Sequence, residues 1–205
     1  RKIFAEAENK ARYDAILATN TSSIELERIA EGLRDPSRLI GLHFFNPVPQ
    51  LPLVEVIRSK FNDDASVAKG ASFALAIGKS PVIVKSAPGF LVNRVLMPYM
   101  LAAVERVERG ESKELIDAAA VAFGMPMGPI ELMDTVGLDV GASVAKELGH
   151  VVPDTSRFAM LVRDKKLGRK TGEGFYKWEK GKAIKGEVPA HGDLAGLGRE
   201  LVRPL

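Results

Sequence analysis

The stretch Gly41-Leu-His-Phe-Phe-Asn-Pro-Val-Pro-Gln-Leu-Pro-Leu-Val-Glu55 places two apolar arms on either side of a turn rich in proline. If each arm is a strand, a hairpin centred on Pro49 puts His43 opposite Glu55. A carboxylate beside an imidazole fixes its tautomer and stabilises the imidazolium that forms when the ring takes a proton. The spacing therefore predicts an acid–base pair, although a buried histidine can also be satisfied by a nearby acid for structural reasons alone.

Composition narrows the class of protein. The 205 residues are 46% hydrophobic, which is enough for one core or two small ones, and the net charge is +3 with acids and bases interspersed. We expect no nucleic-acid partner. With no cysteine and three scattered histidines (His43, His150 and His191), we expect neither disulfides nor a metal site. We expect no secretory signal and no membrane span, and expect a cytoplasmic protein; a bacterial cytoplasm is favoured, and a eukaryotic organelle is the alternative.

The first part of the chain alternates between helical and strand patterns, and the alternation predicts a three-layer α/β sheet over residues 1–86. Helices are expected at 2–12, 24–33 and 64–77, and strands at 15–19, 38–45, 53–57 and 80–85. From Pro88 onward the pattern is helical, with helices expected at 90–109, 112–123, 129–134, 140–148 and 156–166. We therefore predict an all-α domain over 87–178, then a linker. Residues 199–205 weakly repeat 93–98, as if a second helical repeat began within 179–205.

Three asparagines and a serine are candidate ligands. Asn20 and Ser22 follow a strand end, where open α/β sheets bind ligands, and can hold a cofactor ribose or a thioester carbonyl. Plain helix capping by Ser22 or Ser23 is the alternative. Asn46 leaves the same strand end as His43, or else only makes an Asn-Pro turn. Asn93 enters the helical domain and would face a domain junction, or else only solvent.

A second candidate is the loop Gly168-Arg-Lys-Thr-Gly-Glu-Gly174. Its glycines suggest a phosphate cradle in which Lys170 reaches an anionic ligand, but the Walker spacing GxxxxGK[ST] is absent. A basic surface loop is an equal alternative. Glu131 and Asp134 share one helix face, and we expect them to be caps or surface charges.

Six segments together resemble the 3-hydroxyacyl-CoA dehydrogenase family in order and spacing. They are Thr19-Asn-Thr-Ser-Ser23, Gly41-Leu-His-Phe-Phe-Asn-Pro47, Leu53-Val-Glu-Val56, Pro88-Gly-Phe-Leu-Val-Asn-Arg94, Met127-Gly-Pro-Ile-Glu-Leu132 and Lys170-Thr-Gly-Glu-Gly-Phe-Tyr176. The resemblance implies the C-terminal part of a Rossmann-like NAD-binding sheet followed by a helical substrate and dimerisation domain. The tail beyond residue 178 is similar to the multifunctional fatty-acid oxidation proteins.

The resemblance also implies roles. His43 would be the general base that takes the C3 hydroxyl proton of an L-3-hydroxyacyl-CoA while hydride passes to NAD, and Glu55 would orient it. Ser22 and Asn93 would contact the substrate. Asn46, Lys170 and Asn20 would contact the cofactor. A homodimer through the helical domain is also implied.

The family's GxGxxG turn after the first strand does not occur in these residues. We therefore expect a fragment with negligible dehydrogenase activity and weak or no NAD affinity on its own. The alternatives are a related dehydrogenase of small β-hydroxyacids, which would use a lysine base, and a non-catalytic helical dimerisation or scaffold module.

Overall fold

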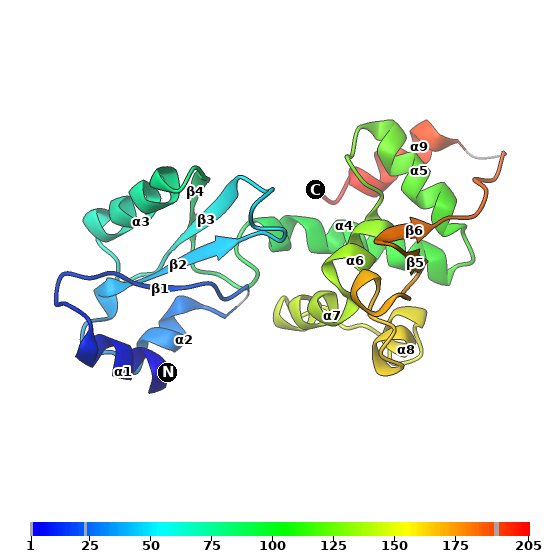
Figure 1. Cartoon of the computed structure of the whole chain (residues 1–205). Helices are drawn as coiled ribbons and strands as arrows, with labels where there is room; N and C mark the ends of the chain where they lie inside the picture. Colours follow the sequence, from blue (N-terminus) through cyan, green and yellow to red (C-terminus); the bar gives the residue numbers. More distant parts are fainter. Residues whose placement is uncertain (1, 23, 191–192) are drawn as a thin grey trace. The chain divides into compact units, whose positions relative to one another are not determined.

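The computed structural model describes residues 2–22, 24–190 and 193–205, which form two compact units, Arg1–Val92 and Asn93–Leu205 (Figure 1). The sequence suggested a change of domain after residue 86, whereas the first unit continues to Val92. This difference has a physical reason, since the backbone N–H groups of Leu91 and Val92 donate hydrogen bonds to Glu55 of the first unit. Each unit is described on its own below.

The first unit is built on a mixed four-stranded sheet in the order β1-β2-β3-β4. β1 pairs parallel with β2, β2 antiparallel with β3, and β3 parallel with β4. The strands are β1 (Leu17–Thr19), β2 (Leu39–Phe44), β3 (Leu53–Arg58) and β4 (Ser80–Lys85). The helices are α1 (Lys2–Lys10), α2 (Leu26–Ala30), the short η1 (Pro36–Arg38) and α3 (Asp64–Ala76). The predicted α/β class is confirmed.

Side chains alternate between the two faces of the sheet along each strand, and the two faces pack against different elements. On one face Ile40, Leu42, Val54 and Val56 form a core with Val67 and Ala74 of α3. Gly70 lets α3 approach closely, since a Cβ there would lie 2.4 Å from Cδ1 of Ile40. On the opposite face Ile57 packs with Leu26 of α2 and with Phe90. His43 and Glu55 point to this second face.

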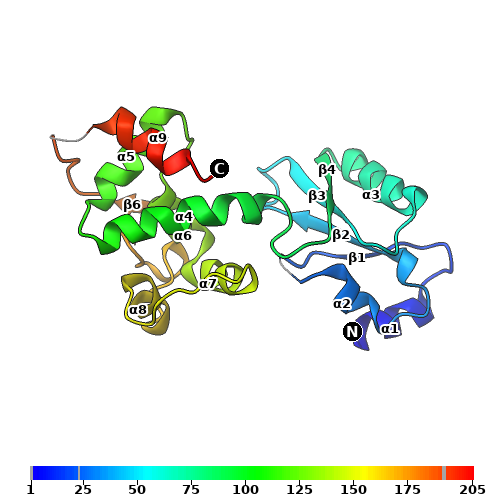
Figure 2. The ribbon, with the colours of Figure 1, turned by 180° about the vertical axis from the view of Figure 1, so that it is seen from behind.

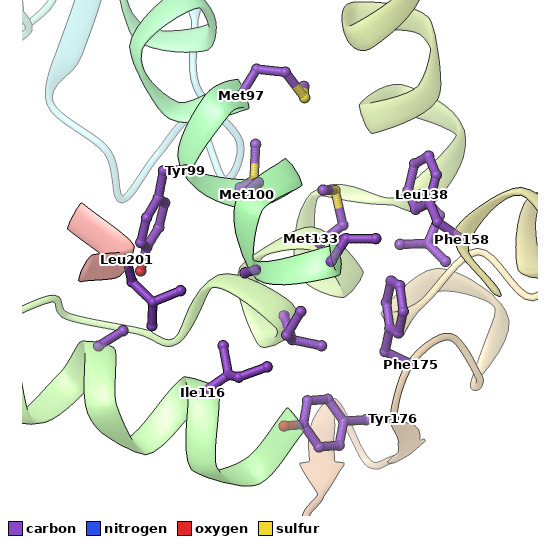
Figure 3. Close-up of a cluster of buried hydrophobic side chains, with 14 of the residues drawn as sticks. Met97, Tyr99, Met100, Ile116, Met133, Leu138, Phe158, Phe175, Tyr176 and Leu201 are labelled. Carbon is purple, nitrogen blue, oxygen red and sulfur yellow. The ribbon is translucent and has the colours of Figure 1, made fainter. Parts of the chain in front are cut away.

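The second unit is helical with one small hairpin. Its elements are α4 (Val92–Glu108), α5 (Lys113–Phe123), α6 (Pro129–Val136), α7 (Leu138–Glu147), α8 (Arg157–Arg163), η2 (Arg169–Thr171), β5 (Lys177–Glu179), β6 (Lys182–Ile184) and α9 (Leu194–Val202). Figure 3 shows part of its core, where side chains of α4, α5 and α6 meet those of α7, α8 and the segment before β5. Ser112 caps α5 by accepting the N–H of Leu115 through its hydroxyl oxygen. Across the described ranges, no helix has the length and apolar character needed to cross a membrane.

The segment after residue 178 belongs to this same helical unit. It contains β6 and α9, and α9 lies against α5, as Figures 1 and 2 show from opposite sides. The contact is close, because a Cβ at Gly198 would lie only 2.7 Å from the carbonyl oxygen of Ala119. Leu201 is 1% exposed and lies in the core. The residues expected to begin a second repeat thus pack into the first helical unit.

Candidate active site

His43 and Glu55 form a buried pair across the β2–β3 hairpin. The two residues are opposite each other in the strand register, and Nδ1 of His43 lies 2.6 Å from Oε2 of Glu55. His43 is 5% exposed and Glu55 is fully buried. The predicted pairing across the hairpin is therefore confirmed.

The second carboxylate oxygen of Glu55 is held by the start of α4. Oε1 accepts the backbone N–H groups of Leu91 and Val92, each at 2.9 Å. N–H groups at a helix start are favourable partners for a negative charge. Because an ionised carboxylate only accepts hydrogen bonds, Nδ1 of His43 is the donor to Oε2. The imidazole is thus oriented as the tautomer whose other nitrogen, Nε2, can accept a proton.

Two phenyl rings flank the imidazole. The ring of Phe45 lies edge-on to it, with centroids 4.6 Å apart, and the ring of Phe90 lies at 5.7 Å. Phe90 ends a turn in which its N–H donates to the carbonyl of Ala87 at 3.0 Å. Both Gly89 and Phe90 have positive φ, 70° and 51°. For a residue with a Cβ, the left-handed backbone conformation costs about 1–3 kcal/mol of conformational free energy. Sequence reasoning missed Phe90, although the Pro-Gly pair before it is a turn signal.

Asn20 and Asn46 lie at the carboxyl ends of the parallel strands β1 and β2. Both are exposed, and Oδ1 of Asn20 accepts the N–H of Phe44 at 2.9 Å, which ties the two strand ends together. Asn46 is followed by a cis peptide bond to Pro47. The structure therefore places these two amides at the same sheet edge as His43.

Helix capping by Ser22 is not what the structure shows. The helix starts only at Leu26, and its N-cap residue, Glu25, makes no capping hydrogen bond through its side chain. The N–H of Leu26 instead donates to Oγ of Ser86, at 2.9 Å. Ser22 itself is exposed, and Ser23 lies outside the described residues.

Asn93 and Lys170 belong to the second unit. Asn93 is half-buried in the first turn of α4. Lys170, in η2, holds its ammonium 2.6 Å from Oδ2 of Asp139. An anionic ligand at Lys170 would have to compete with this ion pair.

The glycine loop 168–174 surrounds a carboxylate of the protein itself. Asp134 is fully buried and accepts the N–H of Phe175 at 2.9 Å, the N–H of Tyr176 at 2.8 Å and Nε1 of Trp178 at 3.0 Å. A Cβ at Gly174 would lie 2.2 Å from Oδ1 of Asp134. The expectation of a cap or surface charge at Asp134 was wrong, because its partners come from residues far along the chain. Burial raises the pKa of Asp134, against the lowering effect of these hydrogen bonds.

Nowhere in the described part of the chain do three or more His, Cys, Asp or Glu side chains gather in a way that could hold a metal ion. The first unit presents an imidazole oriented by a carboxylate, beside two polar amides at the same end of the sheet. Such an arrangement suits proton transfer to or from a bound molecule.

Comparison with known proteins identifies the family. Residues 1–87 match the NAD binding domain of 3-hydroxyacyl-CoA dehydrogenase, and residues 89–178 match the C-terminal domain of the same enzyme family. A probable 3-hydroxyacyl-CoA dehydrogenase of Caenorhabditis elegans is 45% identical over 88% of this chain and 63% of that protein. The fatty acid oxidation complex subunit alpha of Vibrio cholerae is 42% identical over 87% of this chain and 26% of that protein.

Among solved structures, 3-hydroxybutyryl-CoA dehydrogenase from Escherichia coli is 36% identical with a TM-score of 0.80, over 94% of this chain and 42% of that one. The chain therefore spans between about a quarter and two thirds of the length of these relatives. Two adjoining domains of one family account for nearly all of residues 1–178. The chain belongs to the 3-hydroxyacyl-CoA dehydrogenase family.

Proposed function

We propose that the protein carrying this chain oxidises L-3-hydroxyacyl-CoA to 3-ketoacyl-CoA with NAD, as a step of fatty-acid β-oxidation. The observation that carries the proposal is the buried hydrogen bond of 2.6 Å between Nδ1 of His43 and Oε2 of Glu55. It supplies the orientation and the charge compensation that a general base requires.

In this mechanism Nε2 of His43 accepts the proton of the C3 hydroxyl. The hydrogen on C3 departs as hydride, and the C3–O bond becomes a carbonyl. The two oxygens of Glu55 accept one hydrogen bond from His43 and one each from the backbone N–H groups of Leu91 and Val92. The negative charge of Glu55 stabilises the imidazolium that forms.

NAD, when bound, supplies the hydride acceptor. The residues present fit the nicotinamide end of such a cofactor, since Asn20 and Asn46 present amides at the carboxyl edge of parallel strands, where dinucleotides bind in related sheets. We assign these two asparagines to the cofactor, and Ser22 and Asn93 to the substrate oxygen. We retain Lys170 as a weaker cofactor candidate because of its ion pair with Asp139.

The alternatives are less well supported by the geometry. A dehydrogenase of small β-hydroxyacids would use a lysine as base, whereas the base that is oriented and buried here is a histidine. If the chain were a purely structural helical module, it would not account for the buried hydrogen bond between His43 and Glu55. Self-association through the helical unit is compatible with catalysis and stays a prediction.

The test uses His43→Ala and Glu55→Gln in the protein that carries this chain, with NADH formation as the readout. We expect His43→Ala to lower kcat by about 10²–10⁴-fold. Glu55→Gln should lower it by about 10²-fold or more, because the amide NH₂ presents a donor where Nδ1 needs an acceptor. His150→Ala, in the helical unit, is the matched control. Turnover of His43→Ala equal to the parent's, with the fold intact by circular dichroism, would refute the proposal.

A further inference from the structure

Phe90 is the point at which the backbone beside the acid–base pair adopts an unusual conformation. Its φ of 51° follows a φ of 70° at Gly89. The left-handed region is unfavourable for residues with a Cβ, and glycine would occupy it without steric cost. The chain nevertheless carries a large ring at this position. Non-glycine residues held in this way gather at functional sites.

The ring of Phe90 touches the base. It is 2% exposed and packs with Leu26 and Ile57, and its centroid lies 5.7 Å from that of the His43 imidazole, at an interplanar angle of 58°. Phe45 supplies a second ring at 4.6 Å. The imidazole is therefore restrained by a hydrogen bond at Nδ1 and by two aromatic rings at its sides.

The backbone of Phe90 determines the position of the acid's donors. The next two N–H groups along the chain, those of Leu91 and Val92, are the ones that donate to Oε1 of Glu55. The direction of the peptide plane that carries the Leu91 N–H depends on the dihedral angles of Phe90. A return of Phe90 to an ordinary negative φ would turn these donors away from Glu55.

We propose that Phe90 is a positioning residue for the acid–base pair. Its ring sets the plane of the His43 imidazole, and its left-handed backbone holds two amide donors on Glu55. One residue thereby couples the orientation of the base to that of its carboxylate partner. The inference rests on the proposed function for its catalytic consequence, but the geometry it describes can be measured without turnover.

Two substitutions separate the ring from the backbone. Phe90→Gly removes the ring and still allows positive φ, whereas Phe90→Ala removes the ring and also favours negative φ. We expect kcat to fall about 10²-fold in Phe90→Ala and about tenfold in Phe90→Gly, while KM for the acyl substrate changes less than about threefold. If Phe90 mattered only for packing, kcat would fall further in Phe90→Gly than in Phe90→Ala, because glycine removes more of the side chain and makes the backbone more flexible.

Phe90→Leu keeps apolar volume at the site and guards against a failure of the smaller variants to fold. We expect it to lose about tenfold in kcat because the ring is missing. The matched control is the pair Lys180→Ala and Lys180→Gly, at an exposed residue with φ of 49° in the turn between β5 and β6. Neither control should alter kcat.

The readout that is independent of catalysis is the proton NMR signal of Nδ1–H in His43. A short hydrogen bond to a carboxylate places this proton at low field, and we expect the signal to be lost in Phe90→Ala and retained in the parent chain. If His43→Ala leaves turnover unchanged, the proposed function fails while this signal still tests the positioning role. Parental kcat in Phe90→Leu, or a Phe90→Ala variant at least as active as Phe90→Gly with its signal intact, would overturn the inference.

Discussion

At the scale of single residues, buried carboxylates hold together segments that are distant in the sequence. Glu55 accepts N–H groups from residues 36 and 37 positions later, and Asp134 from residues 41 and 42 positions later. Asp117 accepts the N–H of Ile130 at 2.8 Å and the hydroxyl of Tyr176 at 3.0 Å. Each of these acids replaces hydration with several protein donors, which is how a buried charge becomes tolerable.

Substituting Asp134→Asn tests this view of the helical unit. The asparagine side chain has the same shape as that of Asp134, but its NH₂ group replaces one of the two accepting oxygens. At least one N–H group that donates to Asp134 would then face another donor and lose its acceptor. We expect the free energy of unfolding to fall by about 2–3 kcal/mol. Urea unfolding followed by the fluorescence of Trp178, the single tryptophan of the chain, measures it. Asp154→Asn, at an exposed position, should change stability by less than about 0.5 kcal/mol. An equally small change at Asp134 would argue against a stabilising role.

The predictability of these sites follows from sequence distance. The pairing of His43 with Glu55 was predictable because a hairpin relates them by strand register alone. The donors to Glu55 from Leu91 and Val92 were not, since no local pattern relates the start of a helix to a strand that precedes it by a helix and another strand. The contact between the loop 168–174 and Asp134 was not predictable for the same reason. The glycines of the loop make room for Asp134, which lies in α6.

At the scale of elements, the strands and helices largely follow the expected pattern, and their ends differ where distant side chains decide them. The expected helix 24–33 is observed only as Leu26–Ala30, and its first amide is capped by Ser86 from the end of β4. Ser86 also donates to Glu27 at 2.6 Å, so one hydroxyl joins α2 to the strand end. By contrast, the caps Asp63 and Ser112 were predictable, because each lies immediately before its own helix.

Glu8 connects α1 to the turn after α2 and makes that connection dependent on pH. Its carboxylate accepts the N–H groups of Arg34 at 2.9 Å and Asp35 at 2.8 Å, and these bonds hold the pKa of Glu8 below its usual 4.5. A carboxyl whose pKa is lower in the folded state stabilises the fold above its usual pKa, and this stabilisation is lost as pH falls.

We expect Glu8→Gln to be less stable than the parent at neutral pH, with a difference that narrows as pH falls below about 4.5. Urea unfolding at a series of pH values, followed by circular dichroism, measures the difference. Glu6→Gln, an exposed neighbour on the same helix, is the control. A difference that stays constant or widens toward acid pH would contradict the assigned role of Glu8.

At the scale of the whole molecule, the chain joins a unit built on a four-stranded sheet, which carries His43 and Glu55, to a helical unit. The parallel pair β1–β2 and the amides at its end are present, whereas these 205 residues contain no GxGxxG turn between a strand and a helix. The phosphates of a dinucleotide normally bind at such a turn. The contacts proposed above, from Asn20 and Asn46, therefore involve only the nicotinamide end of NAD.

We consequently expect the 205-residue polypeptide by itself to bind NAD weakly, with a Kd of about 1 mM or higher, and to show negligible turnover. Isothermal titration calorimetry measures the affinity. A family member that carries a GxGxxG turn serves as the positive control. Micromolar affinity of the polypeptide alone would show that its own residues suffice for the cofactor.

The burial of Leu201 in the core of the helical unit has a consequence for synthesis on the ribosome. Both backbone donors to Glu55, the N–H groups of Leu91 and Val92, are available once Val92 has left the exit tunnel. The helical unit cannot complete its core until α9 has emerged, roughly a hundred codons later at about 5–20 residues per second. For roughly 5 to 20 seconds the nascent chain would therefore carry the completed His43–Glu55 pair while the face of α5 that packs against α9 is still exposed to solvent.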